Sequence, residues 1–121
     1  MIAMNINSFS GEFSWLSNFW PCKILYKGIL YPSTEHAYQA AKMLTQELKL
    51  EIAKLNSPGK AKRFSRGLVI RSDFHANKLQ IMEAVLRLKF SNRKLAVKLI
   101  LTKDRQLIEG NTWNDTFWGC L

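Results

Sequence analysis

The second half of the chain carries apolar residues at helical spacing. One stripe predicts a helix over residues 76–90 and consists of Leu79, Ile81, Met82, Val85, Leu86 and Phe90. Leu95 and Leu99, four residues apart, predict a further helix over residues 93–102. We expect both stripes to be core, because packing alone explains them.

The first third alternates short apolar runs with turn residues. Residues 23–26 and 29–31 flank Lys27-Gly28, which predicts a β-hairpin that Pro32 ends. Ser33 or Thr34 can then cap a helix that runs to Met43.

The middle of the chain predicts two more helices. One covers residues 48–55, and the next begins at Pro58 and closes at Gly67. Val69 and Ile70 suggest a short extended piece, and residues 107–121 suggest loops and short strands. The predicted fold is mainly α with a small antiparallel β element, in a single compact domain over residues 1–121.

Composition narrows the class of protein. No apolar run approaches the roughly 20 residues of a membrane helix, and residues 1–10 lack the pattern of a secretion signal. We therefore expect a cytoplasmic protein with no membrane partner. The chain has two cysteines and two histidines, Cys22, Cys120, His36 and His75. They are too few and too scattered for a zinc site, so we expect no metal and no cofactor. Both cysteines are interpreted as reduced packing residues.

The charge balance points to anionic partners. Eighteen Lys and Arg against nine Asp and Glu give a formal net charge of +9. This excess attracts nucleic acid or phosphorylated small molecules, although it also serves solubility alone. The net charge therefore does not distinguish a nucleic-acid partner from a phosphorylated small molecule or from a role in solubility.

Four chemistry-bearing residues share one face of the helix that opens at Ser33. Glu35, Tyr38, Gln39 and Lys42 stand at i, i+3, i+4 and i+7. They fit either a ligand-facing ridge or an exposed amphipathic face on which the helix dipole favours Glu35.

Two further clusters are candidates for binding. Residues 109–119 interleave polar side chains with Trp and Phe, as in a base-stacking loop or a self-bonded turn. A basic cluster suits a phosphate or is a solvated face, and consists of Lys60, Lys62, Arg63, Arg66 and Arg71.

In series, several segments resemble the NADAR (YbiA-like) family across nearly the whole chain. They are Trp15-Leu16-Ser17-Asn18-Phe19, Tyr31-Pro32-Ser33-Thr34-Glu35-His36-Ala37-Tyr38-Gln39-Ala40-Ala41-Lys42, Ser57-Pro58-Gly59-Lys60-Ala61, residues 66–78, Glu109-Gly110-Asn111 and Asp115-Thr116-Phe117-Trp118-Gly119. The resemblance implies a mainly helical N-glycosidase that cleaves a ribose–base bond. Implied substrates are ADP-ribosylated guanine in nucleic acid or a phosphorylated ribosylamino-pyrimidine of riboflavin biosynthesis.

The resemblance also implies roles for individual positions. Glu35 matches the catalytic glutamate, Asp115 a second catalytic acid, and Lys42 a lysine that engages the sugar C1, in one version as a Schiff base. The implied substrate-binding positions are Asn18, Phe19, Gln39, Arg66, Arg71, Phe74, Asn111 and Trp118. We expect Phe74 and Trp118 to sandwich the base, and Arg66 and Arg71 to hold phosphate.

Two departures from the family pattern qualify this expectation. Phe74 stands where many members carry Trp, and so lacks an indole N–H donor. The chain ends at Leu121, where relatives usually continue into a final helix, so we expect the domain to lack that helix. A non-catalytic basic module that binds nucleic acid or ADP-ribose is the alternative function.

One spatial condition decides the enzymatic reading. The Glu35 and Asp115 carboxylates have to converge on one ribose-sized hollow. There, one carboxylate stabilises the positive sugar and the other positions water or the base, in either order.

Overall fold

The computed structural model describes residues 11–102, leaving out residues 1–10 and 103–121. In chain order the elements are a 3-10 helix η1 (Gly11–Leu16), strands β1 (Ile24–Tyr26) and β2 (Ile29–Tyr31), and helices α1 (Thr34–Ala40), α2 (Gln46–Lys54), α3 (Pro58–Ser65), α4 (Phe74–Lys89) and α5 (Arg93–Leu101). The mainly helical architecture with an antiparallel hairpin is confirmed.

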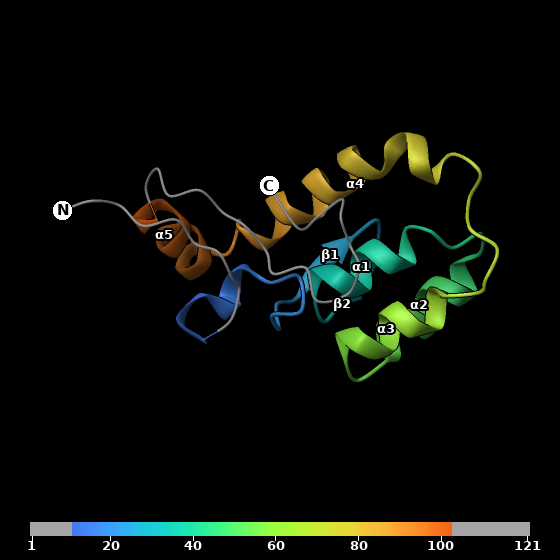
Figure 1. Cartoon of the computed structure of the whole chain (residues 1–121), viewed down its shortest axis with the longest axis horizontal. Helices are drawn as coiled ribbons and strands as arrows, with labels where there is room; N and C mark the ends of the chain where they lie inside the picture. The colour runs from blue at the N-terminus through green and yellow to red at the C-terminus, as the bar shows by residue number, and fades with distance from the viewer. Residues whose placement is uncertain (1–10, 103–121) are drawn as a thin grey trace.

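Helix α1 occupies the centre of the described structure (Figure 1). It contacts α2, α3, α4 and both strands of the hairpin. In Figure 1, α4 runs along one side of α1, α2 and α3 lie on the other, and α5 lies at the far end beside η1. The central position of α1 means that its polar residues are enclosed by other elements.

The hairpin forms in the register that its turn dictates. Ile24 pairs with Tyr31, and Tyr26 pairs with Ile29. Lys27 and Gly28 both have positive φ, at 49° and 85°, which suits the twist of a two-residue hairpin turn.

Local capping signals set the starts of four helices. Ser33, Thr45, Ser57 and Asn92 accept hydrogen bonds from backbone N–H groups in the first turns of α1, α2, α3 and α5. The predicted third and fifth helices agree with α3 and α5 to within two residues. Pro58 is in the first turn of α3, as predicted, and Gly67 follows its end with a φ of 84°.

Other boundaries differ from expectation. Helix α1 ends at Ala40 rather than at Met43, α2 begins two residues early at Gln46, and α4 begins two residues early at Phe74. Val69 and Ile70 form no strand. The predicted stripe of α4 is also partly wrong, because Leu79 is 61% exposed whereas Ile81, Met82 and Val85 are buried.

The core has two parts. The larger joins the hairpin, α1 and α4 with residues of α2 and α3. The smaller joins η1 to α5 through Trp15, Leu16 and Leu95, and Trp15 meets Phe90 edge to face with ring centroids 6.3 Å apart. Within residues 11–102, no helix combines the length and apolarity that crossing a membrane requires.

Candidate active site

All seven residues of α1 are buried, including its carboxylate, imidazole and amide side chains. The alternative of an exposed amphipathic face is therefore wrong for Glu35, Tyr38 and Gln39, which are 7%, 6% and 3% exposed. Ala37 and Ala40 are fully buried, and their small side chains allow neighbouring elements to approach closely. The polar residues of α1 form part of the interior.

Glu35 belongs to a hydrogen-bonded series that reaches across to α3. Gln39 Nε2 donates to Glu35 Oε1 at 2.7 Å, and Ser65 Oγ donates to Gln39 Oε1 at 2.5 Å. Because Ser65 engages the amide oxygen, the amide nitrogen is directed at Glu35. A bond from a neutral donor to an ionised carboxylate is charge-assisted, so this series fixes the orientation of the carboxylate.

The Asn18 carbonyl ties the preceding loop to the start of α1. It accepts from Glu35 N at 3.0 Å and from Thr34 Oγ1 at 3.0 Å, while Asn18 Oδ1 lies 3.3 Å from the same hydroxyl. Phe19 is half-buried, and its N–H donates to Ser17 Oγ at 3.1 Å. The structure therefore places Asn18 beside the backbone of Glu35.

His36 anchors the other side of α1. Its Nε2 lies 2.9 Å from the Leu55 carbonyl oxygen at the end of α2, and its Nδ1 lies 2.6 Å from Ser33 Oγ. Because a carbonyl only accepts, Nε2 carries the proton of the neutral ring, and Nδ1 accepts from Ser33. These contacts give His36 a structural role.

Lys42 lies in the turn after α1, next to two aromatic rings. Its Nζ is 5.4 Å from the ring centroid of Tyr38 and 5.4 Å from that of Phe74, and these rings meet edge to face at 5.4 Å. At this distance a lysine ammonium is attracted by the faces of both rings. Phe74 is only 2% exposed, so its ring is enclosed by protein contacts in this structure.

The two predicted phosphate ligands have different surroundings. Arg71 donates to both carboxylate oxygens of Asp73, at 3.0 and 2.8 Å, and its backbone N–H donates to the Lys42 carbonyl at 2.8 Å. The hydrogen bond from Arg71 lowers the pKa of Asp73, and the same bond raises the pKa of Arg71. Arg66 ends α3 with an exposed side chain.

The sequence comparison places these features in a known family. The NADAR domain matches residues 7–121. The chain belongs to the NADAR domain family. It is 36% identical to the N-glycosidase YbiA of Shigella sonnei, covering 96% of this chain and 74% of that protein. The E. coli N-glycosidase YbiA is 35% identical over the same shares of the two chains.

A second kind of relative belongs to vitamin metabolism. This NADAR chain is 35% identical to a riboflavin biosynthesis protein of Vibrio vulnificus, covering 87% of this chain and 29% of that protein. Among solved structures, the NMR structure of E. coli YbiA matches with a TM-score of 0.82 and 33% identity, covering 98% of this chain and 73% of that one. The resemblance inferred from the sequence is confirmed.

Three predicted site residues of this NADAR chain lie outside the described residues: Asn111, Asp115 and Trp118. The expected convergence of Asp115 with Glu35 stays a prediction. Of the other predicted residues, Glu35, Gln39, Asn18 and the backbone of Phe19 lie around the start and middle of α1, while Lys42, Phe74 and Arg71 gather after its end. Reasoning from sequence missed Thr34 and Ser65, which bond to Asn18 and Gln39.

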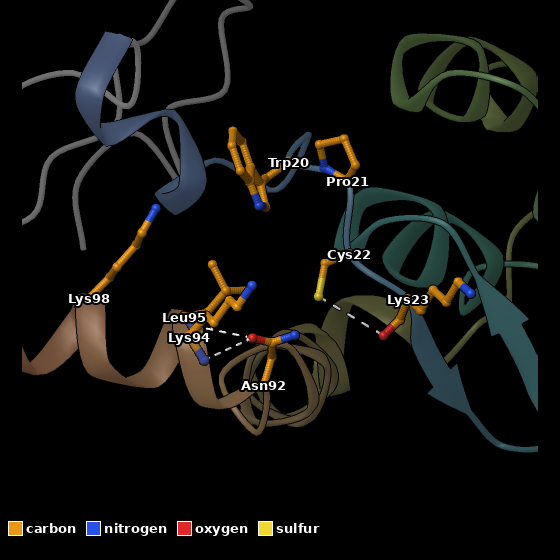
Figure 2. A pocket seen from close by; sticks show the side chains of 8 residues that line it. All are labelled: Trp20, Pro21, Cys22, Lys23, Asn92, Lys94, Leu95 and Lys98. Atoms are coloured by element: carbon orange, nitrogen blue, oxygen red, sulfur yellow. Dashed lines mark hydrogen bonds between the residues drawn. The ribbon is translucent and has the colours of Figure 1, made fainter.

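A hollow of about 410 Å³ separates the segment after η1 from the start of α5 (Figure 2). Its lining combines an indole ring with basic and polar side chains: Trp20, Pro21, Cys22, Lys23, Asn92, Lys94, Leu95 and Lys98. Burial raises the pKa of the Cys22 thiol, against a smaller lowering by the charge of Lys89. Among residues 11–102, no acidic side chain lines the hollow, so this part of its wall is suited to an anion.

A second hollow, of about 260 Å³, lies between the hairpin and the start of α2. Its lining residues are Tyr26, Lys27, Ile29, Tyr31, Ala41, Gln46 and Lys49. Burial lowers the pKa of Lys49, and the charges of Arg71 and Lys27 lower it further. Burial also raises the pKa of Tyr31 to about 12. Glu35 lines neither of the two hollows.

Proposed function

We propose that this NADAR chain hydrolyses the N-glycosidic bond between a ribose and a nitrogenous base. The observation that carries the proposal is the buried, oriented carboxylate of Glu35 in a chain that is 36% identical to a protein named N-glycosidase. A carboxylate that is enclosed and held by a directed donor is suited to electrostatic stabilisation of a cation.

The proposed mechanism follows from the charge that develops on the sugar. As the bond to the base breaks, positive charge builds on the ribose, and Glu35 stabilises it. The bonding electrons leave with the base, which takes up a proton, and water adds to C1. The proton that water loses on adding to C1 balances the one that the base takes up. We assign Asp115 to positioning water or the base, and the two carboxylates can exchange these duties.

Lys42 offers a covalent variant of the same reaction. Its neutral amine would attack C1 as the base departs, and water would then hydrolyse the adduct. Lys42 Nζ lies 5.4 Å from the ring centroids of both Tyr38 and Phe74, so an ammonium there is attracted by the two rings. In the covalent variant this amine has to lose its proton before it attacks; in direct hydrolysis Lys42 remains a cation at the site.

Two substrate classes fit the proposal. The Vibrio relative's name supports a phosphorylated ribosylamino-pyrimidine, and the net charge of +9 supports ADP-ribosylated guanine in nucleic acid. Both carry phosphate, for which Arg66 and Arg71 remain the proposed ligands. A phosphate near the second hollow would also meet Lys27 and Lys49.

The test compares release of free base from both substrates by wild-type protein and by Glu35→Gln. The amide keeps the shape of the side chain and removes its charge, so turnover should fall at least about 100-fold. Glu47→Gln is the matched control, because Glu47 is an exposed carboxylate in the first turn of α2. Turnover within a few-fold of wild type in Glu35→Gln would place the chemistry elsewhere.

A non-catalytic binding module is the second candidate function, and the larger hollow favours it. Trp20 offers a ring for stacking, and Lys94 and Lys98 supply positive charge at the opposite wall (Figure 2). This function predicts salt-dependent binding of plain single-stranded nucleic acid that weakens in Lys94→Gln, without release of base. Base release that depends on Glu35 would exclude a purely binding role.

A further inference from the structure

Lys89 is a fully buried lysine in the last turn of α4. Its side chain has 0% exposure, although lysine side chains in proteins are almost always solvated at their ends. Taking an ammonium group out of water is costly unless the protein supplies compensating partners. Lys89 Nζ donates to the Ser17 carbonyl at 2.8 Å and lies 5.2 Å from the ring centroid of Phe90.

The Ser17 contact crosses 72 residues of sequence and reaches the loop that holds Glu35. Ser17 is followed directly by Asn18, whose carbonyl accepts from the backbone N–H of Glu35 and from the Thr34 hydroxyl. The end of α4, the loop at residues 17–18 and the first turn of α1 are therefore linked in series by hydrogen bonds.

We propose that Lys89 is a positioning residue, whose ammonium group holds the Ser17–Asn18 segment against the first turn of α1 and thereby fixes Glu35. The inference rests on the proposed function, since it assigns Lys89 to the reaction through Glu35. Lys89 contacts the Ser17 carbonyl and the Phe90 ring, so we assign it to holding the loop rather than to the reacting atoms.

A lysine at this place supports a positioning role. Apolar side chains can replace a whole buried ion pair at little cost in stability, whereas removal of one charged member leaves its partners without a bond. A methionine would fill the space beside Phe90, yet it would leave the Ser17 carbonyl without its ammonium donor. Lys89→Met should therefore both lower stability and release the loop, so its activity has to be compared per folded molecule.

The experiment uses Lys89→Met, Lys89→Gln and Lys89→Arg in the full chain. Steady-state base release gives kcat and KM, normalised to folded protein, and two-dimensional NMR follows the backbone amide of Glu35, which bonds to Asn18. We expect Lys89→Met to lower kcat about tenfold or more, through misplacement of a catalytic group, with KM within about twofold. The Glu35 amide resonance should move, and Lys89→Arg should restore part of both signals.

Glu83→Gln is the matched control. Glu83 is an exposed residue of α4, the helix that carries Lys89, and its carboxylate pairs with Arg87 one turn further along at 2.7 Å. Loss of this exposed pair should cost about 0.5 kcal/mol of stability or less and leave kcat and the Glu35 amide unchanged. Equal kcat per folded molecule in Lys89→Met and Glu83→Gln, with an unmoved Glu35 amide, would overturn the proposal.

Two outcomes separate this inference from the proposed function. If Lys89→Met fails to fold, Lys89→Gln and Lys89→Arg still decide the point, because a Glu35 amide identical to wild type in both contradicts the tether. If wild-type protein releases no base from either substrate, the proposed function fails. The NMR comparison still tests whether Lys89 sets the surroundings of Glu35.

Discussion

Removing the hydroxyl of Ser65 tests whether the orientation of Glu35 depends on a residue of α3. In Ser65→Ala, Gln39 Oε1 loses the donor at 2.5 Å that directs the amide nitrogen towards Glu35. The amide of Gln39 can then turn over and present oxygen to the carboxylate. Two oxygens in contact repel, so Glu35 should change its position or its hydration.

The expected magnitudes follow from the burial of the pair. Leaving a buried acceptor without a donor costs about 1–3 kcal/mol, and the better helix propensity of alanine returns up to about 0.5 kcal/mol. We expect a net loss of about 1–2 kcal/mol and a fall in Tm of about 4–8 °C. Misplacing a hydrogen bond to a charged group, worth about 1.5–3 kcal/mol, should lower kcat about tenfold to a hundredfold.

Ser57→Ala provides the control for this variant. Ser57 caps the same helix by accepting from Lys60 N at 3.2 Å, and it makes no contact with Gln39 among those described. Its loss should cost about 1 kcal/mol without changing turnover. Urea unfolding gives the stability of both variants, and base release per folded molecule gives their activity. Equal kcat values for the two variants would refute the dependence of Glu35 on Ser65.

Three further predictions concern His36, Lys42 and the hairpin turn. Burial lowers the pKa of His36, and the hydrogen bond to the Leu55 carbonyl raises it by a smaller amount. The folded state therefore favours the neutral ring, and this contribution to stability is complete above the pKa of about 6.5 that His36 has in the unfolded chain. Stability should fall below that pH, by at most about 1.4 kcal/mol per pH unit for this proton, and urea unfolding of His36→Gln should show a flatter profile between pH 5 and 7. The covalent route through Lys42 predicts that borohydride added during turnover traps a protein–sugar adduct, which mass spectrometry detects in the wild-type protein and not in Lys42→Ala. If the wild-type protein keeps its unmodified mass, the covalent route is removed. Gly28→Ala should destabilise the protein by about 1 kcal/mol, because Gly28 has a φ of 85°. Gly59→Ala in α3 should be neutral or stabilising. Calorimetry that gives the same change in Tm for both variants would contradict this expectation.

Features with local causes could be predicted from sequence. Lys27-Gly28 fixes the hairpin register through its positive φ angles, and Ser57-Pro58 marks the start of α3. These signals act within a few residues, so the surrounding fold does not need to be known. The same holds for Asn92 at the start of α5.

Features that depend on contacts between distant segments could not be predicted. Leu79 continues an apolar stripe, yet it is 61% exposed, because the face of α4 that packs on α1 and the hairpin is centred on Met82 and Val85. Lys89 is fully buried, and its Nζ bonds to a carbonyl 72 residues away in the sequence. Ser65 gave no signal, since its partner Gln39 lies 26 residues away.

The residue spacing on α1 is compatible with both a ligand-facing ridge and an exposed amphipathic face. Periodicity places Glu35, Gln39 and Lys42 on one face, but it does not say whether water or protein covers that face. The structure covers Glu35 and Gln39 with protein, and within residues 11–102 every fully buried polar side-chain atom has a hydrogen-bond partner.

A polar series inside a core contributes little net stability compared with apolar residues of the same volume, and it costs a great deal when one member is missing. Glu35 and Gln39 therefore contribute more to specificity of geometry than to folding energy. Their arrangement is what a fold retains where a carboxylate has to be held in one orientation at a fixed place. Lys89 is a second case, because its ammonium group is enclosed by protein and donates to the loop beside Glu35.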